Sequence, residues 1–215
     1  MKRLVIVGAG GFGREALGIV LDIGGFQPIA FVDAEADRAG TMVGGVPVAG
    51  GDEALTALRA QGAQALVVAI GNPQIRRRLW GLGKELGFEL PSLVHPMAYK
   101  AADVTVGEGS VFYPGSVTMA GVRIGQGVLV NAGATIGHET TVGDFVNVNP
   151  GANIAGHVTL GEGAFIGIGA CVREATVVGA HAVVGAGSVV IRDVADRATV
   201  YGVPARVRAR MAVSS

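Results

Sequence analysis

The C-terminal half of the chain repeats a six-residue unit without a break from Val106 to Val190. Thirteen of the fifteen residues at the first position of the unit are aliphatic, and Phe112 and Thr118 are the two exceptions. An α-helix cannot use this period, because successive apolar positions would rotate around its surface instead of forming one stripe. A three-sided solenoid can use it, with one short strand and one corner in each unit.

Three units, or 18 residues, make one coil of such a solenoid, and coils stack at the strand spacing of about 4.8 Å. The fifth position of each complete unit is always Ser, Thr, Ala or Val, as expected for a side chain that faces a narrow interior. Glycine often follows the aliphatic residue, and we interpret it as permitting backbone conformations that a Cβ would strain. The pattern predicts a left-handed parallel β-helix of about five coils. A β-sandwich, the alternative, would alternate at period two with irregular spacing.

The first half of the chain alternates short aliphatic runs with amphipathic stretches, which is typical of a short Rossmann-like α/β domain with a parallel sheet. Asn72 is expected to cap a helix that begins at Pro73. The expected strands are residues 4–7, 29–32, 65–70 and 92–94, and the expected helices are 13–23, 52–60 and 73–86. The predicted domains are 1–95, a nucleotide-sugar-binding βαβ domain, then 96–198, the β-helix, and 199–215, a C-terminal cap and tail.

Composition narrows the possible partners and the compartment. The chain has 17 Lys and Arg and 17 Asp and Glu, so no net field favours nucleic acid or an anionic membrane. The single Cys171 allows no internal disulfide, in agreement with a reducing compartment. No segment approaches the ~20 apolar residues needed to span a bilayer. These observations predict a cytoplasmic protein without membrane insertion.

A glycine-rich turn from Gly8 to Gly13 matches GxGxxG between the first expected strand and the first expected helix. Its glycines let backbone N–H groups approach a phosphate at the positive end of the helix. Asp33, at the end of the second strand, is placed to accept hydrogen bonds from a ribose or a base. About 95 residues supply little more than one mononucleotide-binding half, so one nucleotide fits better than NAD. In the alternative interpretation, the glycines only make a tight turn and Asp33 only ends a strand.

Polar residues that break the solenoid pattern are the candidates for chemistry. His138 takes the third position of its unit, at a corner, and should project outward. A histidine, with an ordinary pKa of about 6.5, is available there as a general base, and Glu139 is placed to bind its other ring nitrogen. Asn131 and Asn149 are separated by one full coil and should stack on the same edge, as a ladder or as ligand contacts. Solvated surface decoration is the alternative for the histidine and its neighbour.

A metal site is not expected. The separations between His138, His157 and His181 along the chain are not multiples of the coil length, so these histidines should not line up along one edge. The last two are interpreted as surface residues. Cys171 occupies a place in the repeat that favours a structural role over nucleophilic attack.

A glycine-rich βαβ domain comes first in this chain, and a hexapeptide solenoid follows it. Four shorter segments accompany them: Ala69 to Asn72, His95-Pro96, Gly137 to Glu139 and Gly202 to Arg206. Together these features resemble the NeuD/PglD family of sugar O- and N-acetyltransferases. The resemblance covers nearly the whole chain.

The resemblance implies an acetyl-CoA-dependent enzyme that forms a homotrimer, with acetyl-CoA between adjacent subunits and a nucleotide-linked amino sugar on the first domain. It implies His138 as the base and Glu139 as the residue that raises its basicity. Two departures are Phe12, where many members have His, and Asn147, where the bacillosamine-pathway enzyme has His. The resemblance places the nucleotide at Gly10, Gly11, Phe12, Asp33, Ala34, Gly71 and Gln74, and acetyl-CoA at Asn147, Ile168 and Ala186.

N-acetylation of a nucleotide-linked amino sugar is therefore the leading hypothesis, with no metal required. One base at the same corner serves amine and hydroxyl acceptors alike, so O-acetylation of sialic acid or another sugar remains an alternative. A non-catalytic nucleotide-sugar-binding trimer and an NAD-dependent enzyme are two further hypotheses.

Overall fold

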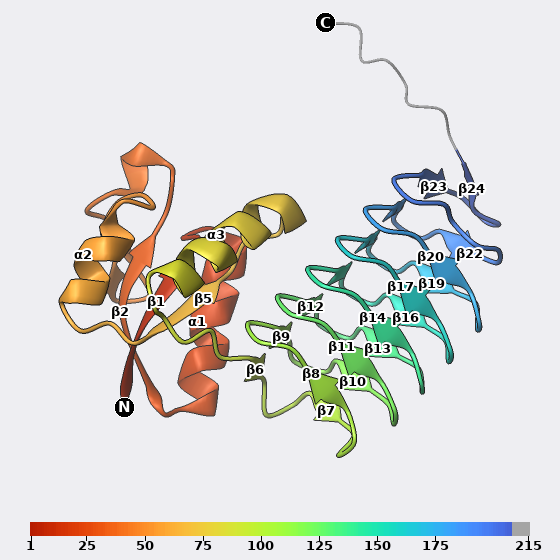
Figure 1. Cartoon of the computed structure of the whole chain (residues 1–215), viewed down its shortest axis with the longest axis horizontal. Coiled ribbons are helices and arrows are strands. Elements are labelled where there is room, and N and C mark those ends of the chain that lie inside the picture. Colours follow the sequence, from red (N-terminus) through yellow and green to blue (C-terminus); the bar gives the residue numbers. More distant parts are fainter. Residues whose placement is uncertain (208–215) are drawn as a thin grey trace, which may run out of the picture. The chain divides into compact units, whose positions relative to one another are not determined.

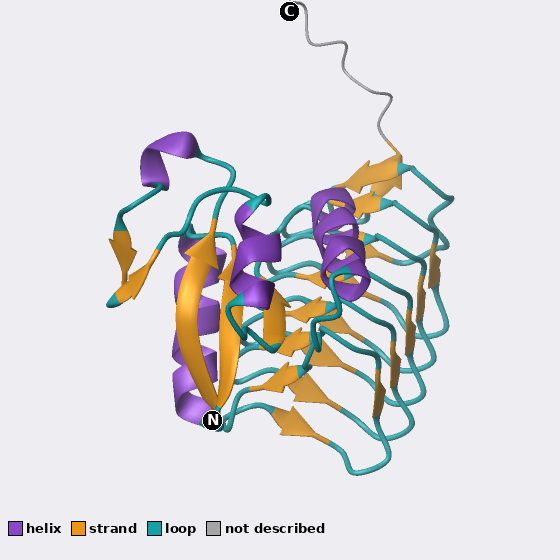
Figure 2. Cartoon of the chain, turned by 60° about the vertical axis from the view of Figure 1, so that its left-hand side comes forward, coloured by secondary structure: helices purple, strands orange, loops and turns teal. Residues whose placement is uncertain are grey.

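The computed structural model describes residues 1–207, which divide into a first compact unit, Met1–His95, and a second that begins at Pro96. All described helices belong to the first unit (Figure 1). The second unit is built from short strands and loops (Figure 2). Both parts of the predicted fold class are thereby confirmed: a small α/β unit with a parallel sheet, followed by a left-handed β-helix.

A three-stranded parallel sheet of order β2-β1-β5 forms the centre of the first unit. The residues from Leu4 to Val7 on β1 are all buried, as expected for a parallel strand with both faces covered. Because the three strands are parallel, their carboxyl ends meet at one edge. The elements are β1 (Lys2–Val7), α1 (Gly11–Ile23), β2 (Phe26–Val32), α2 (Ala54–Ala60), β5 (Ala65–Val68), α3 (Pro73–Glu85) and β6 (Leu93–Val94).

A small hairpin and a short 3-10 helix between β2 and α2 were not expected from the sequence. The hairpin joins β3 (Met42–Val43) to β4 (Val46–Pro47), and the helix is η1 (Ala36–Arg38). Strands of two residues are too short to show a period, and only Gly44-Gly45 between them signals a turn in the sequence. The two glycines of that turn adopt positive φ, as the turn-rich sequence indicates.

The start of α3 follows the predicted capping pattern. The Asn72 side-chain oxygen accepts hydrogen bonds from the backbone N–H groups of Gln74 (2.9 Å) and Ile75 (3.1 Å), which confirms the N-cap. Arg76, one turn into the helix, is fully buried. Its Nη1 donates to the carbonyl of Ile70 at 2.6 Å, so the loop after β5 is held by a buried guanidinium.

The second unit stacks short strands, most of them of two residues, into three faces. Most strands pair in parallel with the strand one coil further on, as Thr135 does with Asn153. The first face contains β7 (Tyr99–Lys100), β10 (Val117–Thr118), β13 (Thr135–Ile136), β16 (Asn153–Ile154), β19 (Cys171–Val172) and β22 (Val189–Val190). The second contains β8 (Thr105–Val106), β11 (Arg123–Ile124), β14 (Thr141–Val142), β17 (Thr159–Leu160) and β20 (Val177–Val178). Within the second unit, the third contains β9 (Val111–Phe112), β12 (Leu129–Val130), β15 (Asn147–Val148), β18 (Phe165–Ile166), β21 (Val183–Val184), β23 (Thr199–Tyr201) and β24 (Arg206–Val207).

The solenoid is longer than the sequence pattern indicates. Its first face has six strands rather than the expected five coils, because this face begins at β7, before Val106. Lys100 takes the aliphatic position of that first unit, and this substitution hides the unit from a search for apolar residues. At the other end, β23 pairs in parallel with β21 and still belongs to the third face, whereas β24 turns back antiparallel. The remainder of the expected C-terminal tail, 208–215, lies outside the described residues.

The glycines that follow the aliphatic residues have a different role from the one expected. Their φ angles are ordinary, so conformational strain does not explain them. A Cβ on Gly161 would instead come within 2.5 Å of the backbone nitrogen of Ala180 on the next coil. Close approach of stacked coils therefore excludes side chains at this position. The left-handed backbone conformation belongs to the fourth position of the unit, where most residues are glycine.

None of the helices within residues 1–207 has the length and apolar character needed to cross a membrane.

Candidate active site

His138 lies in the corner that connects β13 on the first face to β14 on the second. Its side chain is 59% exposed, which confirms the expected outward projection. The adjacent Glu139 places its Oε2 3.4 Å from the Nδ1 of His138. A carboxylate accepts hydrogen bonds only, so this contact favours the tautomer with the proton on Nδ1 and a lone pair on Nε2.

His157 joins this pair, contrary to the sequence expectation that the histidines would not align. Its Nε2 lies 3.1 Å from the same Oε2 of Glu139. The rings of His138 and His157 are perpendicular, with their centroids 4.9 Å apart. The three side chains therefore form one exposed cluster: His157 is a surface residue, as expected, but it also contacts the His138–Glu139 pair.

The register of the coils explains this cluster. His157 follows Glu139 by one full coil, so the glutamate and the second histidine occupy the same place on successive coils, although His138 and His157 do not. The backbone N–H of His157 donates to the carbonyl of His138 at 2.9 Å. Both Glu139 and His157 take the fourth position, with φ of 55° and 57°. A non-glycine residue at that position is the sequence signal that would have found His157.

The cluster also offers the donors of a metal site. One ligand atom from each of His138, Glu139 and His157 lies within 4.8 Å of the others. Two imidazoles and one carboxylate are ligands that zinc accepts, with a fourth position left for water. A coordinated imidazole has no free lone pair for a proton, so the same ring cannot act as a ligand and as a base at the same time.

The other polar candidates of the solenoid separate into different places. Asn131 and Asn149 are buried, and their amides donate to the carbonyls of Val148 (3.3 Å) and Ile166 (2.7 Å) on the next coil. They form a structural ladder. His181 lies at a corner between the second and third faces, where its ring covers the Cα of Gly163.

The three residues associated with acetyl-CoA by resemblance lie away from the His138 corner within one chain. Asn147 is buried on β15 of the third face. Ile168 and Ala186 are exposed, one coil apart, on the corner between the third and first faces. His138 lies on the corner between the first and second faces. A single solenoid therefore presents these two groups on different edges.

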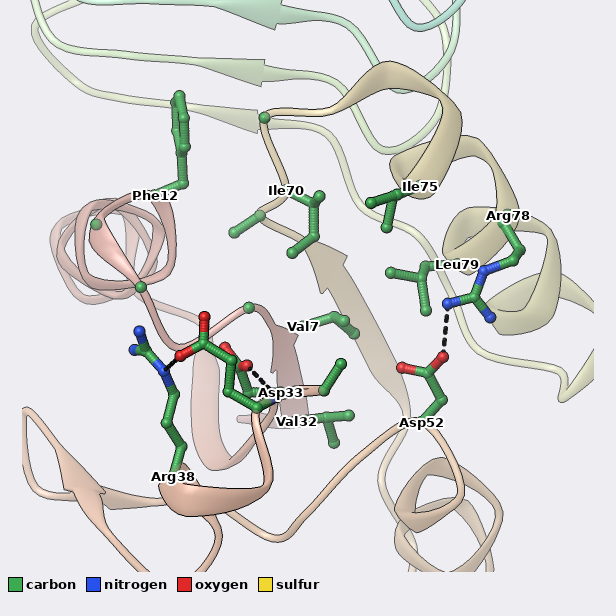
Figure 3. Close-up of a pocket in the computed structure, with 17 residues that line it drawn as sticks. Val7, Phe12, Val32, Asp33, Arg38, Asp52, Ile70, Ile75, Arg78 and Leu79 are labelled. Atoms are coloured by element: carbon green, nitrogen blue, oxygen red, sulfur yellow. Dashed lines mark hydrogen bonds and ion pairs between the residues drawn. The ribbon is translucent and has the colours of Figure 1, made fainter. Parts of the chain in front are cut away.

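The first unit has a pocket of about 330 Å³ at the carboxyl ends of β1, β2 and β5 (Figure 3). This is where open α/β sheets bind ligands. Six of the seven residues expected at a nucleotide line it, and Gln74 does not. Phe12 is directed away from Asp33 and Asp52 (Figure 3). The six are Gly10, Gly11, Phe12, Asp33, Ala34 and Gly71.

Asp33 fixes the two loops at the edge of this pocket. Its Oδ2 accepts from the backbone N–H of Ala9 at 2.6 Å, and its Oδ1 accepts from that of Glu35 at 2.9 Å. Arg38 donates to the carbonyl of Ala9 at 3.0 Å. Its hydrogen bond with Glu35 raises the pKa of Arg38 above the ordinary value, and Asp33 and Asp37 add to this effect. The guanidinium therefore keeps its positive charge beside the glycine-rich turn.

A second cation closes the other side of the pocket. Arg78 on α3 forms an ion pair with Asp52, with Nη2 and Oδ2 2.7 Å apart (Figure 3). The two side chains bridge α3 and the segment before α2. Arg38 and Arg78, each paired with a carboxylate that also lines the pocket, place guanidinium N–H groups at a site formed by a glycine-rich turn and a helix N-terminus. Such N–H donors suit a phosphate ligand.

A left-handed β-helix with an outward imidazole and carboxylate, preceded by an α/β unit with a pocket at its strand ends, defines a hexapeptide-repeat acyltransferase with a separate ligand-binding domain. Residues 3–81 match the family model of the PglD N-terminal domain. Among solved structures, a mutant of perosamine N-acetyltransferase from Caulobacter crescentus, in complex with CoA and GDP-perosamine, is 37% identical. The match covers 97% of this chain and 98% of that one, with a TM-score of 0.92. The chain belongs to the NeuD/PglD family of sugar acetyltransferases, which confirms the resemblance.

Two further structures support this assignment. The acetyltransferase domain of PglB from Neisseria gonorrhoeae, in complex with acetyl coenzyme A, is 36% identical over 96% of this chain and 99% of that one, with a TM-score of 0.89. WeeI from Acinetobacter baumannii is 27% identical over 97% of this chain and 100% of that one, with a TM-score of 0.86. The search of curated proteins found no match.

Proposed function

We propose that this protein transfers the acetyl group of acetyl-CoA to the amine of a nucleotide-linked sugar, with His138 as general base. The observation that carries this function is the exposed His138–Glu139 pair on a solenoid that matches an N-acetyltransferase along its whole length. An amine acceptor is favoured over a hydroxyl because that relative is an N-acetyltransferase bound to a nucleotide-linked sugar.

The chemistry follows from the positions of the two side chains. As the sugar amine attacks the thioester carbonyl, the Nε2 of His138 accepts its proton, and Glu139 stabilises the resulting imidazolium through Nδ1. A C–N bond forms and the C–S bond breaks. The imidazolium then returns the proton to the departing thiolate, so that free CoA and the acetylated sugar leave. No covalent acyl-enzyme is required, and Cys171 takes no part.

We assign nucleotide binding to the pocket of the first unit. The glycine-rich turn, Arg38 and Arg78 provide N–H donors for phosphates, and Asp33 holds the turn in position. This assignment gives residues 1–95 the substrate-binding role and the solenoid the catalytic one. The predicted cytoplasmic location remains a prediction.

We further propose that the active form is a homotrimer. The expected acetyl-CoA contacts Ile168 and Ala186 lie on one edge of the solenoid and His138 lies on another. If the edge of one copy that carries Ile168 and Ala186 contacts the edge of a second copy that carries His138, the acetyl-CoA contacts and the base come together. Such a heterologous contact closes into a ring when the rotation permits.

The function is tested with a panel of UDP-, GDP- and CMP-linked amino sugars and acetyl-CoA, by following free thiol release. His138→Ala is expected to lower kcat about 10²-fold or more with no change in thermal stability. His181→Ala, which changes a half-buried histidine at another corner, is the control and should retain activity. A His138→Ala rate near that of the wild type would overturn the assignment.

The trimer is tested by mixing two inactive variants, His138→Ala and Ile168→Asp, after joint unfolding and refolding. If each site takes its base from one subunit and its acetyl-CoA edge from the next, random assembly restores about 25% of the sites. Active sites contained in single chains would restore none.

A further inference from the structure

The carboxylate of Glu139 serves two imidazoles instead of one. Its Oε2 lies 3.4 Å from the Nδ1 of His138 and 3.1 Å from the Nε2 of His157. The shorter contact is the one to His157, which belongs to the next coil. Because a carboxylate is acceptor-only, both imidazoles must present an N–H to it.

The glutamate needs such a second contact to be held in place. Its side chain is 61% exposed, and a free glutamate side chain occupies many rotamers, so ordering it costs conformational entropy. The only other group that the described contacts place on this carboxylate is His138 itself, at the longer distance. A second donor from a neighbouring coil restricts the carboxylate to the rotamers that reach both rings.

The backbone of the solenoid fixes the position of His157, the residue that donates to Glu139. Glu139 and His157 are one coil apart, share the left-handed conformation and are linked by the hydrogen bond from the His157 N–H to the His138 carbonyl. Ala175 lies one coil after His157, at the same position of its unit, and has φ of 52°. The chain therefore accommodates alanine at this backbone position without a change of conformation.

We propose that His157 is a positioning residue for acetyl transfer: it holds the Glu139 carboxylate against His138 and so keeps the proton of His138 on Nδ1 and the lone pair on Nε2. This inference rests on the proposed function, in which His138 is the base. His157 itself touches neither the acyl group nor the acceptor in this role.

The kinetic test uses His157→Ala and His157→Gln. The alanine variant should lower kcat about 10-fold and leave KM for both substrates unchanged, a smaller loss than removal of the base itself. The glutamine variant should restore most of kcat, because its amide N–H can donate to the carboxylate as Nε2 does. The matched control is His181→Ala, at the same position of its unit with φ of 56°. Unchanged kcat in His157→Ala, or no rescue by glutamine, would overturn the proposal.

A double-mutant cycle with Glu139→Ala tests whether His157 acts through the glutamate. In that background, the second substitution should cost nothing further in kcat, since the carboxylate that it orients is absent. An equal loss in both backgrounds would show that His157 acts independently, and the proposal would fail.

An NMR measurement that does not depend on catalysis separates this inference from the proposed function. Long-range ¹H–¹⁵N NMR reports which ring nitrogen of His138 carries the proton. The wild type should show the Nδ1–H tautomer, and His157→Ala should show a mixture weighted toward Nε2–H. Unchanged tautomers would overturn the positioning role even if acetyl transfer is established. If instead the tautomer shifts while His138→Ala keeps full activity, the proposed function fails and the hydrogen-bond network stands.

Discussion

Gly156 lies directly beneath the ring of His138. A Cβ at residue 156 would come within 2.6 Å of both Cε1 and Nε2 of that ring. The φ angle of Gly156 is not in the left-handed region, so alanine is compatible with the backbone there. The glycine therefore provides the space in which the imidazole lies.

Gly156→Ala is expected to displace the His138 ring and lower kcat about 10-fold or more, since a general base must remain within hydrogen-bond reach of its proton. The fold should tolerate the change, because the end of an exposed side chain can move away. Steady-state kinetics and a thermal melt measure the two effects. A normal kcat would mean that the ring position seen here is not needed for catalysis.

Added Zn²⁺ is expected to inhibit the enzyme at micromolar concentration, because the cluster of His138, Glu139 and His157 supplies three ligands and binding removes the lone pair of the base. EDTA should leave the rate of the untreated enzyme unchanged. His157→Gln lacks one ligand and is expected to require a higher Zn²⁺ concentration for half inhibition. Equal sensitivity of the two proteins would contradict zinc binding at this cluster.

Asp33→Ala is expected to raise KM for the nucleotide sugar about 10-fold and to leave KM for acetyl-CoA unchanged. The carboxylate accepts hydrogen bonds from the N–H groups of Ala9 and Glu35, and hydrogen bonds to a charged group are worth about 1.5–3 kcal/mol. The substitution should weaken binding of the nucleotide sugar in the pocket and leave proton transfer to His138 unchanged. Separate titrations of the two substrates make the comparison, and an equal rise in both KM values would argue against the assigned pocket.

Gly161→Ala is expected to destabilise the solenoid by about 3 kcal/mol or more, because its Cβ would overlap the backbone of the next coil, which cannot move aside. Gly133→Ala is the matched control. Gly133 has φ of 65° with open space around it, so the cost should be that of the left-handed conformation, about 1 kcal/mol. Denaturant unfolding at one protein concentration compares them. A larger loss for Gly133→Ala would reverse the roles assigned to the two glycine positions.

Much of the first unit was readable because local signals and tertiary structure agree there. Asn72 and Pro73 start a helix by the rules of capping, and the structure places the cap where the sequence predicts it. The turn from Gly8 to Gly13 follows the central strand and reaches the pocket at the strand ends. Gln74 could not be placed in this way, because the orientation of one helical side chain depends on how the helix packs.

The period of six by itself determined the solenoid, since no other regular structure places an aliphatic residue inward at every sixth position. It also put His138 on an outward corner. Only the tertiary structure decided what surrounds that corner. The separation between His138 and His157 along the chain does not match the length of a coil, whereas Glu139 and His157, one coil apart, stack in register. Backbone pairing between coils joins residues one coil apart, and the carboxylate of Glu139 extends from its own coil to reach both rings.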